Sequence, residues 1–307
     1  MSKIVCAGSI NIDISASATK PLNLHGKNPG AVVMANPGGV VGNVAEVLAR
    51  IGHDTAIVST AGIGGFNDMV VNDCGAAGIN IDHVRREQGA DVVICVFVND
   101  EKGDLVVMAA NPAAPTCVIT VDQIKAADKL IRECDVFFLC PTLPSDTIDY
   151  IIETYPDMIK MSDVGSVYSV PKLTPYLPYL HTLKVNEREA AAFAGHPTDT
   201  EENVYAAAQK ILALGVKNVV ITLGDRGAVY AGKNFYKTYG VKKVDNVVNT
   251  SGAGDSFFAG LMHACANGLN IDDSMEFSAA CARLTIQSHR TINPDITMQA
   301  VLQEMKR

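Results

Sequence analysis

The residues best suited to chemistry lie in a glycine-rich stretch at positions 249–260. It reads Asn-Thr-Ser-Gly-Ala-Gly-Asp-Ser-Phe-Phe-Ala-Gly, and its second half begins the apolar spacing of a helix packed on a core. A flexible loop therefore leads into a helix N-terminus, where unpaired backbone N–H groups and the helix dipole favour anions. Gly252 and Gly254, on either side of Ala253, carry no side chain that would keep an anion away. The stretch predicts an anion-binding cradle.

A carboxylate, Asp255, stands at the mouth of this cradle. Beside a bound phosphoryl group, a carboxylate can accept the proton of an attacking hydroxyl while the N–H groups stabilise the transferred phosphate. The alternative is that Asp255 is the N-cap of the helix, because aspartate is common there. This stretch alone favours neither role.

Two earlier motifs suit a ligand with several hydroxyl groups. Asn11 and Asp13 follow the first expected strand two residues apart, so they lie on one side of an extended segment and suit vicinal hydroxyls, although both are also ordinary turn formers. Gly38 and Gly39 open a turn into a helix, where Asn43 either caps the helix or offers its amide to a ligand. Each motif leaves two interpretations open.

Two strand ends in the second half of the chain suit a nucleotide. Asn186 closes a strand and Glu189 follows three residues later, which is the spacing of a capping box but also suits groups that hold water ligands of Mg²⁺. Thr222, Gly224 and Gly227 form a glycine turn after another strand and could touch a nucleotide. The glycine run at 61–66 lacks the G-x-G-x-x-G spacing, so a nicotinamide or flavin site is not expected.

Apolar strands and amphipathic helices alternate along the chain. This alternation predicts an α/β fold with a parallel sheet covered by helices on both faces, and ligands at the carboxyl ends of its strands. Residues 92–98 and 104–109 flank a turn and predict a β-hairpin, which could pair with residues 15–37 in a small separate sheet. We expect strands at 4–8, 55–60, 135–140, 158–162, 181–185 and 218–223, and helices at 43–51, 68–78, 121–133, 145–154, 187–194, 202–214 and from 256 onward.

The small sheet suits a lid over the strand-end cleft, because a phosphoryl-transfer site must exclude water that would compete as acceptor. We expect a kinase core with the nucleotide site in residues 1–14, 38–90 and 112–307. The β-sheet lid is expected in residues 15–37 and 91–111.

Composition restricts the partners and the compartment. The 307 residues are 48% hydrophobic, enough for a large core, and the net charge of −8 without a long basic run argues against a nucleic acid polymer as partner. Eight cysteines without a C-x-x-C pair are typical of free thiols in a reducing compartment. No long apolar span is visible, so we expect no membrane association and a cytoplasmic location.

Taken in order, these motifs resemble the PfkB, or ribokinase-like, family of sugar and nucleoside kinases, and they span almost the whole chain. The resemblance implies a three-layer α/β/α sandwich with a mostly parallel central sheet and a small β-sheet lid. It implies Mg²⁺-dependent transfer of the γ-phosphoryl group of ATP to a primary hydroxyl of a small sugar or nucleoside. The roles implied are Asp255 as general base, the N–H groups of Gly252, Ala253 and Gly254 as anion hole, Asp13, Gly39 and Asn43 as substrate ligands, Asn186 and Glu189 near Mg-ATP, and residues 222–227 with a helix around 278–283 beside the nucleotide.

Within this family, residues 28–30, Asn249 and residues 291–295 look like the corresponding stretches of pseudouridine kinases, which implies the 5′-hydroxyl of pseudouridine as acceptor. Ribose, another nucleoside or a sugar acid is the alternative acceptor, and a ligand-sensing protein without turnover is the alternative of another class. Many relatives have aspartate at the position of Asn249, where it helps hold a potassium ion. Its absence here weakens the case for activation by a monovalent cation, although backbone carbonyl oxygens could still bind one. Relatives often dimerise through the lid, and the exposed edges of a small sheet favour such a homodimer.

Overall fold

The computed structural model describes residues 1–102, 105–111, 117–244 and 246–307. Within these residues the largest element is a nine-stranded sheet in the order β13-β12-β11-β10-β9-β8-β1-β4-β5. The pairings from β5 across to β11 are parallel, and β12 and β13 join by antiparallel pairings. The strands are β1 (Lys3–Ala7), β4 (Asp54–Ala61), β5 (Asn80–Arg86), β8 (Val136–Leu139), β9 (Lys160–Asp163), β10 (Thr182–Asn186), β11 (Asn218–Thr222), β12 (Ala228–Gly232) and β13 (Phe235–Tyr239).

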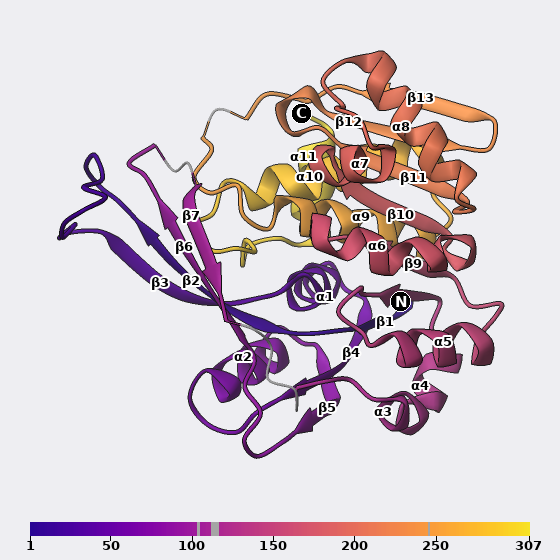
Figure 1. Cartoon of the computed structure of the whole chain (residues 1–307), viewed down its shortest axis with the longest axis horizontal. Helices are drawn as coiled ribbons and strands as arrows, with labels where there is room; N and C mark the ends of the chain where they lie inside the picture. Colours follow the sequence, from indigo (N-terminus) through magenta and orange to yellow (C-terminus); the bar gives the residue numbers. More distant parts are fainter. Residues whose placement is uncertain (103–104, 112–116, 245) are drawn as a thin grey trace.

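Helices cover both faces of this sheet (Figure 1), which confirms the expected α/β/α sandwich with its mostly parallel sheet. Neighbouring residues of β1 show why: Ile4 and Cys6 pack into one apolar core, while Val5 and Ala7 pack into the other. One layer contains α1 (Val40–Arg50), α2 (Gly65–Ala76), α9 (Ala253–Ala266), α10 (Ile271–Thr285) and α11 (Met298–Met305). The other contains α3 (Val121–Ala126), α4 (Asp128–Arg132), α5 (Ser145–Thr154), α6 (Val170–Leu173), α7 (Glu187–Ala194) and α8 (Glu201–Ala213), and the 3₁₀ helices are η1 (Val167–Ser169), η2 (Thr174–Tyr179) and η3 (Gly224–Arg226).

The expectation of one helix at 121–133 is wrong. The segment forms α3 and α4, separated at Ala127, whose ψ of 8° departs from the helical value. The N–H of Ala127 is shared between the carbonyl oxygens of Gln123 and Ile124, as is common at helix ends. The local apolar pattern continues through this break, so the pattern does not reveal it.

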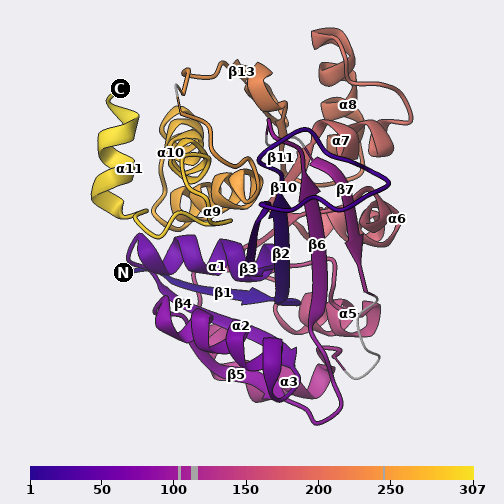
Figure 2. The same ribbon diagram turned by 90° about the vertical axis from the view of Figure 1, so that its left-hand side faces the viewer.

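A second, four-stranded sheet in the described part of the chain projects from the body in the order β3-β2-β6-β7 (Figures 1 and 2). Its strands are β2 (Asn11–Ser17), β3 (Val32–Gly38), β6 (Val93–Asn99) and β7 (Leu105–Ala110). The antiparallel pair β6 and β7 is the expected hairpin, although residues 103 and 104 of its turn lie outside the described residues. The division into core and lid at the expected boundaries stays a proposal, since β2 begins at Asn11 and β3 ends at Gly38, beyond those limits.

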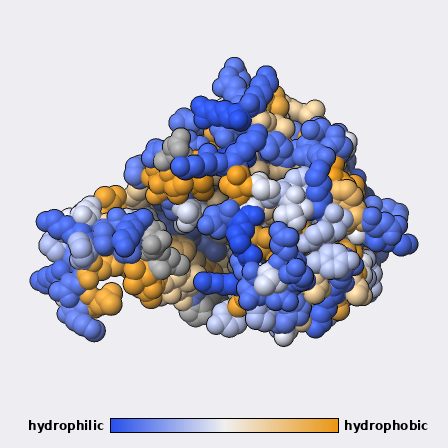
Figure 3. All heavy atoms as spheres, turned by 90° about the horizontal axis from the view of Figure 1, so that it is seen from above, coloured by the Kyte–Doolittle hydropathy of each residue, from blue (hydrophilic) through white to orange (hydrophobic). Residues whose placement is uncertain are grey.

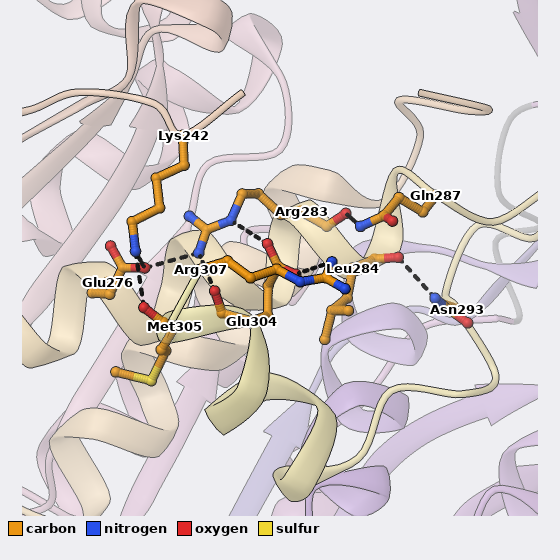
Figure 4. A network of polar contacts seen from close by, with 9 residues as sticks. All are labelled: Lys242, Glu276, Arg283, Leu284, Gln287, Asn293, Glu304, Met305 and Arg307. Atoms are coloured by element: carbon orange, nitrogen blue, oxygen red, sulfur yellow. Dashed lines mark hydrogen bonds and ion pairs between the residues drawn. The ribbon is translucent and has the colours of Figure 1, made fainter. Parts of the chain in front are cut away.

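An ion-pair network fixes the C-terminal helix layer (Figure 4). The Arg283 guanidinium of α10 contacts Glu304 of α11 and Glu276 of its own helix, at 2.8 Å in each case. Nearby, the Asn293 amide donates to the Leu284 carbonyl oxygen at 2.8 Å. These contacts hold the segment that follows α10 in place, and that segment forms one wall of the cleft described below.

Two further observations concern the cysteines and the search for membrane-spanning helices. All eight cysteines are free thiols. Among the residues described, no helix combines the length and the apolar character that a membrane span requires.

Candidate active site

Asp255 and Asn43 meet across two helices. The Asn43 amide of α1 donates to a carboxyl oxygen of Asp255 in α9 at 2.6 Å. Asp255 is the third residue of α9, whose N-cap is Gly252, and it makes no capping hydrogen bond. Asn43 lies inside α1, whose N-cap is Gly39. The N-cap interpretation is therefore wrong for both residues, and their polar groups face each other instead.

The two glycines of the cradle are required by close contacts. Gly252 has φ of +76°, and a methyl group on it would collide with the carbonyl oxygen of Thr291. A methyl group on Gly254 would lie 2.9 Å from the ammonium nitrogen of Lys184. The N–H of Ala253, between them, donates to the Thr250 carbonyl oxygen at 3.4 Å, a long hydrogen bond.

Burial changes the proton affinity of Asp255. Burial, followed by the neighbouring Asp163 carboxylate, raises the pKa of Asp255 to about 6, against the opposing effects of Lys184 and Asn43. A carboxyl group with a pKa close to neutrality is well matched to accept a proton from a substrate hydroxyl. The environment of Asp255 thus suits a general base.

Lys184 and Asp163 form a buried ion pair beside this carboxylate. Their strands, β10 and β9, place the two residues opposite each other, and Nζ lies 2.8 Å from Oδ2. Burial lowers the pKa of Lys184, but Asp163 and the other nearby carboxylates raise it overall, so the ammonium stays charged. Sequence reasoning assigned neither residue a role. The available signal was a lysine within an apolar strand and a carboxylate at the end of the strand before it.

Asn11 and Asp13 lie on β2, a strand of the small sheet. Burial and then the charge of Asp255 raise the pKa of Asp13 to about 7, which places the two carboxyl groups in one electrostatic environment. Gly38 lets the Asp13 carboxyl group lie against the backbone, since a methyl group on Gly38 would overlap with it. Within the described residues, the buried Oδ1 of Asn11 has no hydrogen-bond partner. These groups are suited to hold ligand hydroxyls.

A cavity of about 270 Å³ opens between the small four-stranded sheet and the loop of residues 248–251 that leads into α9. In the view from above, the surface is hollowed where the lid meets the body (Figure 3). Asp13 was expected at the ligand, and Asn249, Ser251 and Thr291 belong to stretches that the sequence singles out, but sequence reasoning gave no role to the other lining residues, which come from distant segments. Lid residues in the lining include Ser15, Met34, Asn36 and Phe97, and body residues include Asn249, Ser251, His289 and Thr291.

The residues expected at the nucleotide lie on neighbouring strand ends. Asn186 and Glu189 form both hydrogen bonds of a capping box, at 2.8 and 2.9 Å, and Thr222 pairs with Asn186 across β10 and β11. Burial, followed by the Asp163 charge, raises the pKa of Glu189 to about 7. Gly224 and Gly227 both have positive φ, at +62° and +97°. None of these residues lines the cavity; of the predicted acceptor and catalytic residues, Asp13 lines it, whereas Asn11, Gly38, Gly39, Asn43, the residues of 252–254 and Asp255 do not.

Two further segments that were expected near ligands have side chains that make contacts within the protein. Ser278 of α10 is fully buried and donates to the Ser274 carbonyl oxygen, and Arg283 is occupied by Glu304, so these two side chains serve the helix layer. Asn249 accepts a hydrogen bond from the N–H of Ser251 at 3.0 Å, and its amide donates to the carbonyl oxygen of His289 at 3.4 Å. The Asn249 side chain therefore stabilises the loop before α9 through hydrogen bonds, and it carries no negative charge.

Comparison with known proteins identifies the group to which this architecture belongs. Residues 1–298 match the model of the pfkB family of carbohydrate kinases. The chain belongs to this family. It is accordingly a phosphotransferase with a hydroxyl group as acceptor, as the resemblance implied.

Individual relatives support this membership. The pseudouridine kinase of Escherichia coli K12 is 25% identical and aligns over 97% of this chain and 95% of its own length. Among solved structures, Arabidopsis thaliana ribokinase complexed with ribose and ATP has a TM-score of 0.83 at 23% identity and covers both chains completely. A putative ribokinase II of E. coli in complex with ATP and Mg²⁺ has a TM-score of 0.81 at 19% identity, with both chains again completely covered. At these identities the two structures establish the fold.

Asp255→Asn should stabilise the fold at pH 8 more than at pH 5. Because the folded-state pKa lies above the ordinary value of 3.8, the wild-type protein loses stability as the pH rises through about 6. The amide removes this loss, with an upper limit of about 3 kcal/mol. Thermal melting at both pH values measures the gain. An equal gain at both would contradict the burial argument, and Asp82→Asn, at an exposed position, should change stability by less than about 0.5 kcal/mol.

Proposed function

We propose that the protein transfers the γ-phosphoryl group of Mg-ATP to the 5′-hydroxyl of pseudouridine, giving pseudouridine 5′-phosphate and ADP. The observation that carries the chemistry is the partly buried Asp255 carboxyl at the start of α9, held by Asn43, with its charge acting on Asp13. These three groups come from α9, α1 and β2, and Asp255 lies in the first turn of α9, at a helix N-terminus.

Each group then has a defined task. Asn11, Asp13, Gly38, Gly39 and Asn43 hold the hydroxyls of the acceptor. Asp255 accepts the proton late in the transfer, because an alcohol becomes acidic only once its oxygen has begun to bond to phosphorus. The N–H groups of residues 252–254 stabilise the negative charge of the transferred group, and the lid excludes water.

The remaining strand ends fit the donor. Mg-ATP would supply the phosphoryl group, and Asn186 with Thr222, Gly224 and Gly227 would lie beside it. Glu189 uses one carboxyl oxygen in the capping box, which leaves the other for a water ligand of Mg²⁺. The E. coli ribokinase-like protein with ATP and Mg²⁺ has the same fold, which supports this use of the nucleotide.

Two observations favour pseudouridine as acceptor. One is the alignment with E. coli pseudouridine kinase over nearly the whole chain. The other is the position of Asn249 and Thr291, which line the cleft and belong to stretches that look like those kinases. The third such stretch, residues 28–30, does not line it, since the Asn28 side chain bonds within the loop between β2 and β3. With no tryptophan in the chain, Phe97 and His289 are rings of the cleft that could stack on a base.

Another acceptor within the family is the second candidate. The Arabidopsis ribokinase structure that contains ribose and ATP matches this fold over its full length, which favours a smaller sugar. A ligand-sensing protein has less support, because the loop of residues 252–255 retains both the glycines and the carboxylate of a catalytic site. We place the activity in the cytoplasm, where free thiols are stable.

The deciding experiment measures ADP release with Mg-ATP and, in turn, pseudouridine, uridine, adenosine, ribose, fructose and 2-keto-3-deoxygluconate. We expect kcat/KM for pseudouridine to exceed the others by at least about a hundredfold, or roughly 2.7 kcal/mol. Preference for another acceptor would replace the substrate and keep the mechanism. No turnover with any acceptor would favour the sensing protein.

Asp255→Ala should lower kcat by about two to four orders of magnitude with the active acceptor, because both the base and its positioning are lost. Steady-state kinetics and circular dichroism together separate lost chemistry from lost folding. Asp82→Asn, at an exposed position, is the matched control and should retain wild-type kcat. A near-wild-type rate for Asp255→Ala would exclude Asp255 as general base.

We also propose a homodimer through the lid. The lid face opposite the cleft presents Val33, Val96 and Val107, which are 64%, 38% and 53% exposed. Apolar side chains are visible on the projecting lid in Figure 3. Light scattering should give twice the chain mass of 32.5 kDa, and Val33→Glu with Val107→Glu should give the single mass. A monomeric wild-type protein would contradict the proposal.

A further inference from the structure

Lys184 is a buried cation with unused hydrogen-bonding capacity. Its side chain is 6% exposed, and its ammonium carries three N–H donors. Within residues 1–102, 105–111, 117–244 and 246–307, Asp163 is its one hydrogen-bond acceptor. Asp163 is itself fully engaged, since its other oxygen accepts the N–H of Gly165 at 3.1 Å. The ion pair is therefore fixed at one end, while the ammonium keeps donors for a further anion.

A second buried lysine shows how the chain satisfies such a group when it is purely structural. Lys160 lies at the start of β9, the strand that Asp163 ends, and it is 2% exposed. Its ammonium donates to three backbone carbonyl oxygens, those of Tyr155, Pro156 and Met158. Burial normally requires this complete set of partners. The incomplete set at Lys184 is thus a specific feature of its position.

That position is directly beneath the anion cradle. The ammonium lies 2.9 Å from where a Cβ on Gly254 would be, and Gly254 is the second residue of α9. A cation at a helix N-terminus is unfavourable, because it faces the positive end of the dipole. The arrangement becomes favourable when an anion lies between them. Asp255 and Asp163 supply part of this negative charge, and a transferred phosphoryl group would supply the rest.

We propose that Lys184, anchored by Asp163, is a catalytic residue whose ammonium donates to the transferring phosphoryl group from beneath α9. This inference rests on the proposed kinase function and adds a residue to it. The pair holds positive charge at a fixed point, where it is stronger than in water because the site is buried. A buried ion pair often adds little to the free energy of unfolding, because both charges lose their hydration. Stability alone therefore does not explain the Lys184–Asp163 pair, whereas a role in phosphoryl transfer does.

The test compares Lys184→Met with the double variant Asp163→Asn/Lys184→Met and with Lys160→Met. The double variant leaves no lone buried charge, so it separates lost folding from lost charge. Lys160→Met removes a buried ammonium from the neighbouring strand, at the opposite end from the site. For each we measure melting temperature, kcat and KM with the acceptor that the wild-type protein uses, and binding of Mg-ADP with and without aluminium fluoride, which mimics the transferring phosphoryl group.

We expect both Lys184 variants to lower kcat about a hundredfold, with KM values changed by less than about threefold. Binding of Mg-ADP with aluminium fluoride should weaken by a similar factor, and binding of Mg-ADP alone should stay within about threefold. Lys160→Met should lose thermal stability and keep its kcat.

Wild-type kcat in the double variant, or equal weakening of Mg-ADP with and without aluminium fluoride, would overturn the inference and leave the kinase function intact. Absence of turnover by the wild-type protein with every acceptor would overturn the proposed function, and the inference with it.

Discussion

Several charged groups are buried together at the carboxyl ends of β9 and β10, and the site depends on how they balance. Asp163, Asp255 and Glu189 are acids around the single ammonium of Lys184, and α9 adds the positive end of its dipole. Burial alone would neutralise such carboxyl groups, as the raised pKa values of Asp255 and Glu189 show. The positive charge of Lys184 and of the helix N-terminus favours the ionised form of the nearby carboxyl groups. A carboxyl group that takes up and releases a proton must be able to exist in this ionised form.

The fold supplies this balance by bringing distant segments to one edge of the sheet. Parallel strands place their carboxyl ends side by side, so β9 and β10 present Asp163 and Lys184 to the start of α9. α1 crosses the same face and brings Asn43 to Asp255. The lid enters from the neighbouring strand end, because β2 follows β1 after a short turn. Acid, cation and acceptor ligands thus come from separate elements and meet only in the folded chain.

This origin explains what the sequence could and could not predict. Strand and helix alternation predicted the sandwich, because burial on both faces imposes an apolar pattern that is local and regular. The glycine-rich stretch predicted a loop that leads into a helix N-terminus with Asp255, because Gly252, Gly254 and Asp255 lie within four consecutive residues. Local patterns could not decide whether Asn43 caps its helix, since its partner lies 212 positions away. Lys184 was missed for the same reason, and the break at Ala127 left no mark on the apolar pattern.

The cleft is lined by residues of the small sheet as well as by residues of the body, and this bears on how acceptors would be distinguished. The groups proposed to act on phosphate belong to the body, whereas Met34, Asn36 and Phe97 belong to the small sheet and face the cleft by the alternation of β3 and β6. A change at these lid positions alters the shape and polarity of the acceptor side without displacing Asp255, which is held by Asn43 from α1. One arrangement of base, cradle and ion pair can therefore serve different acceptors. Under the proposed function, the family motifs would carry the chemistry, and the alternate side chains of β3 and β6 that face the cleft would select the acceptor.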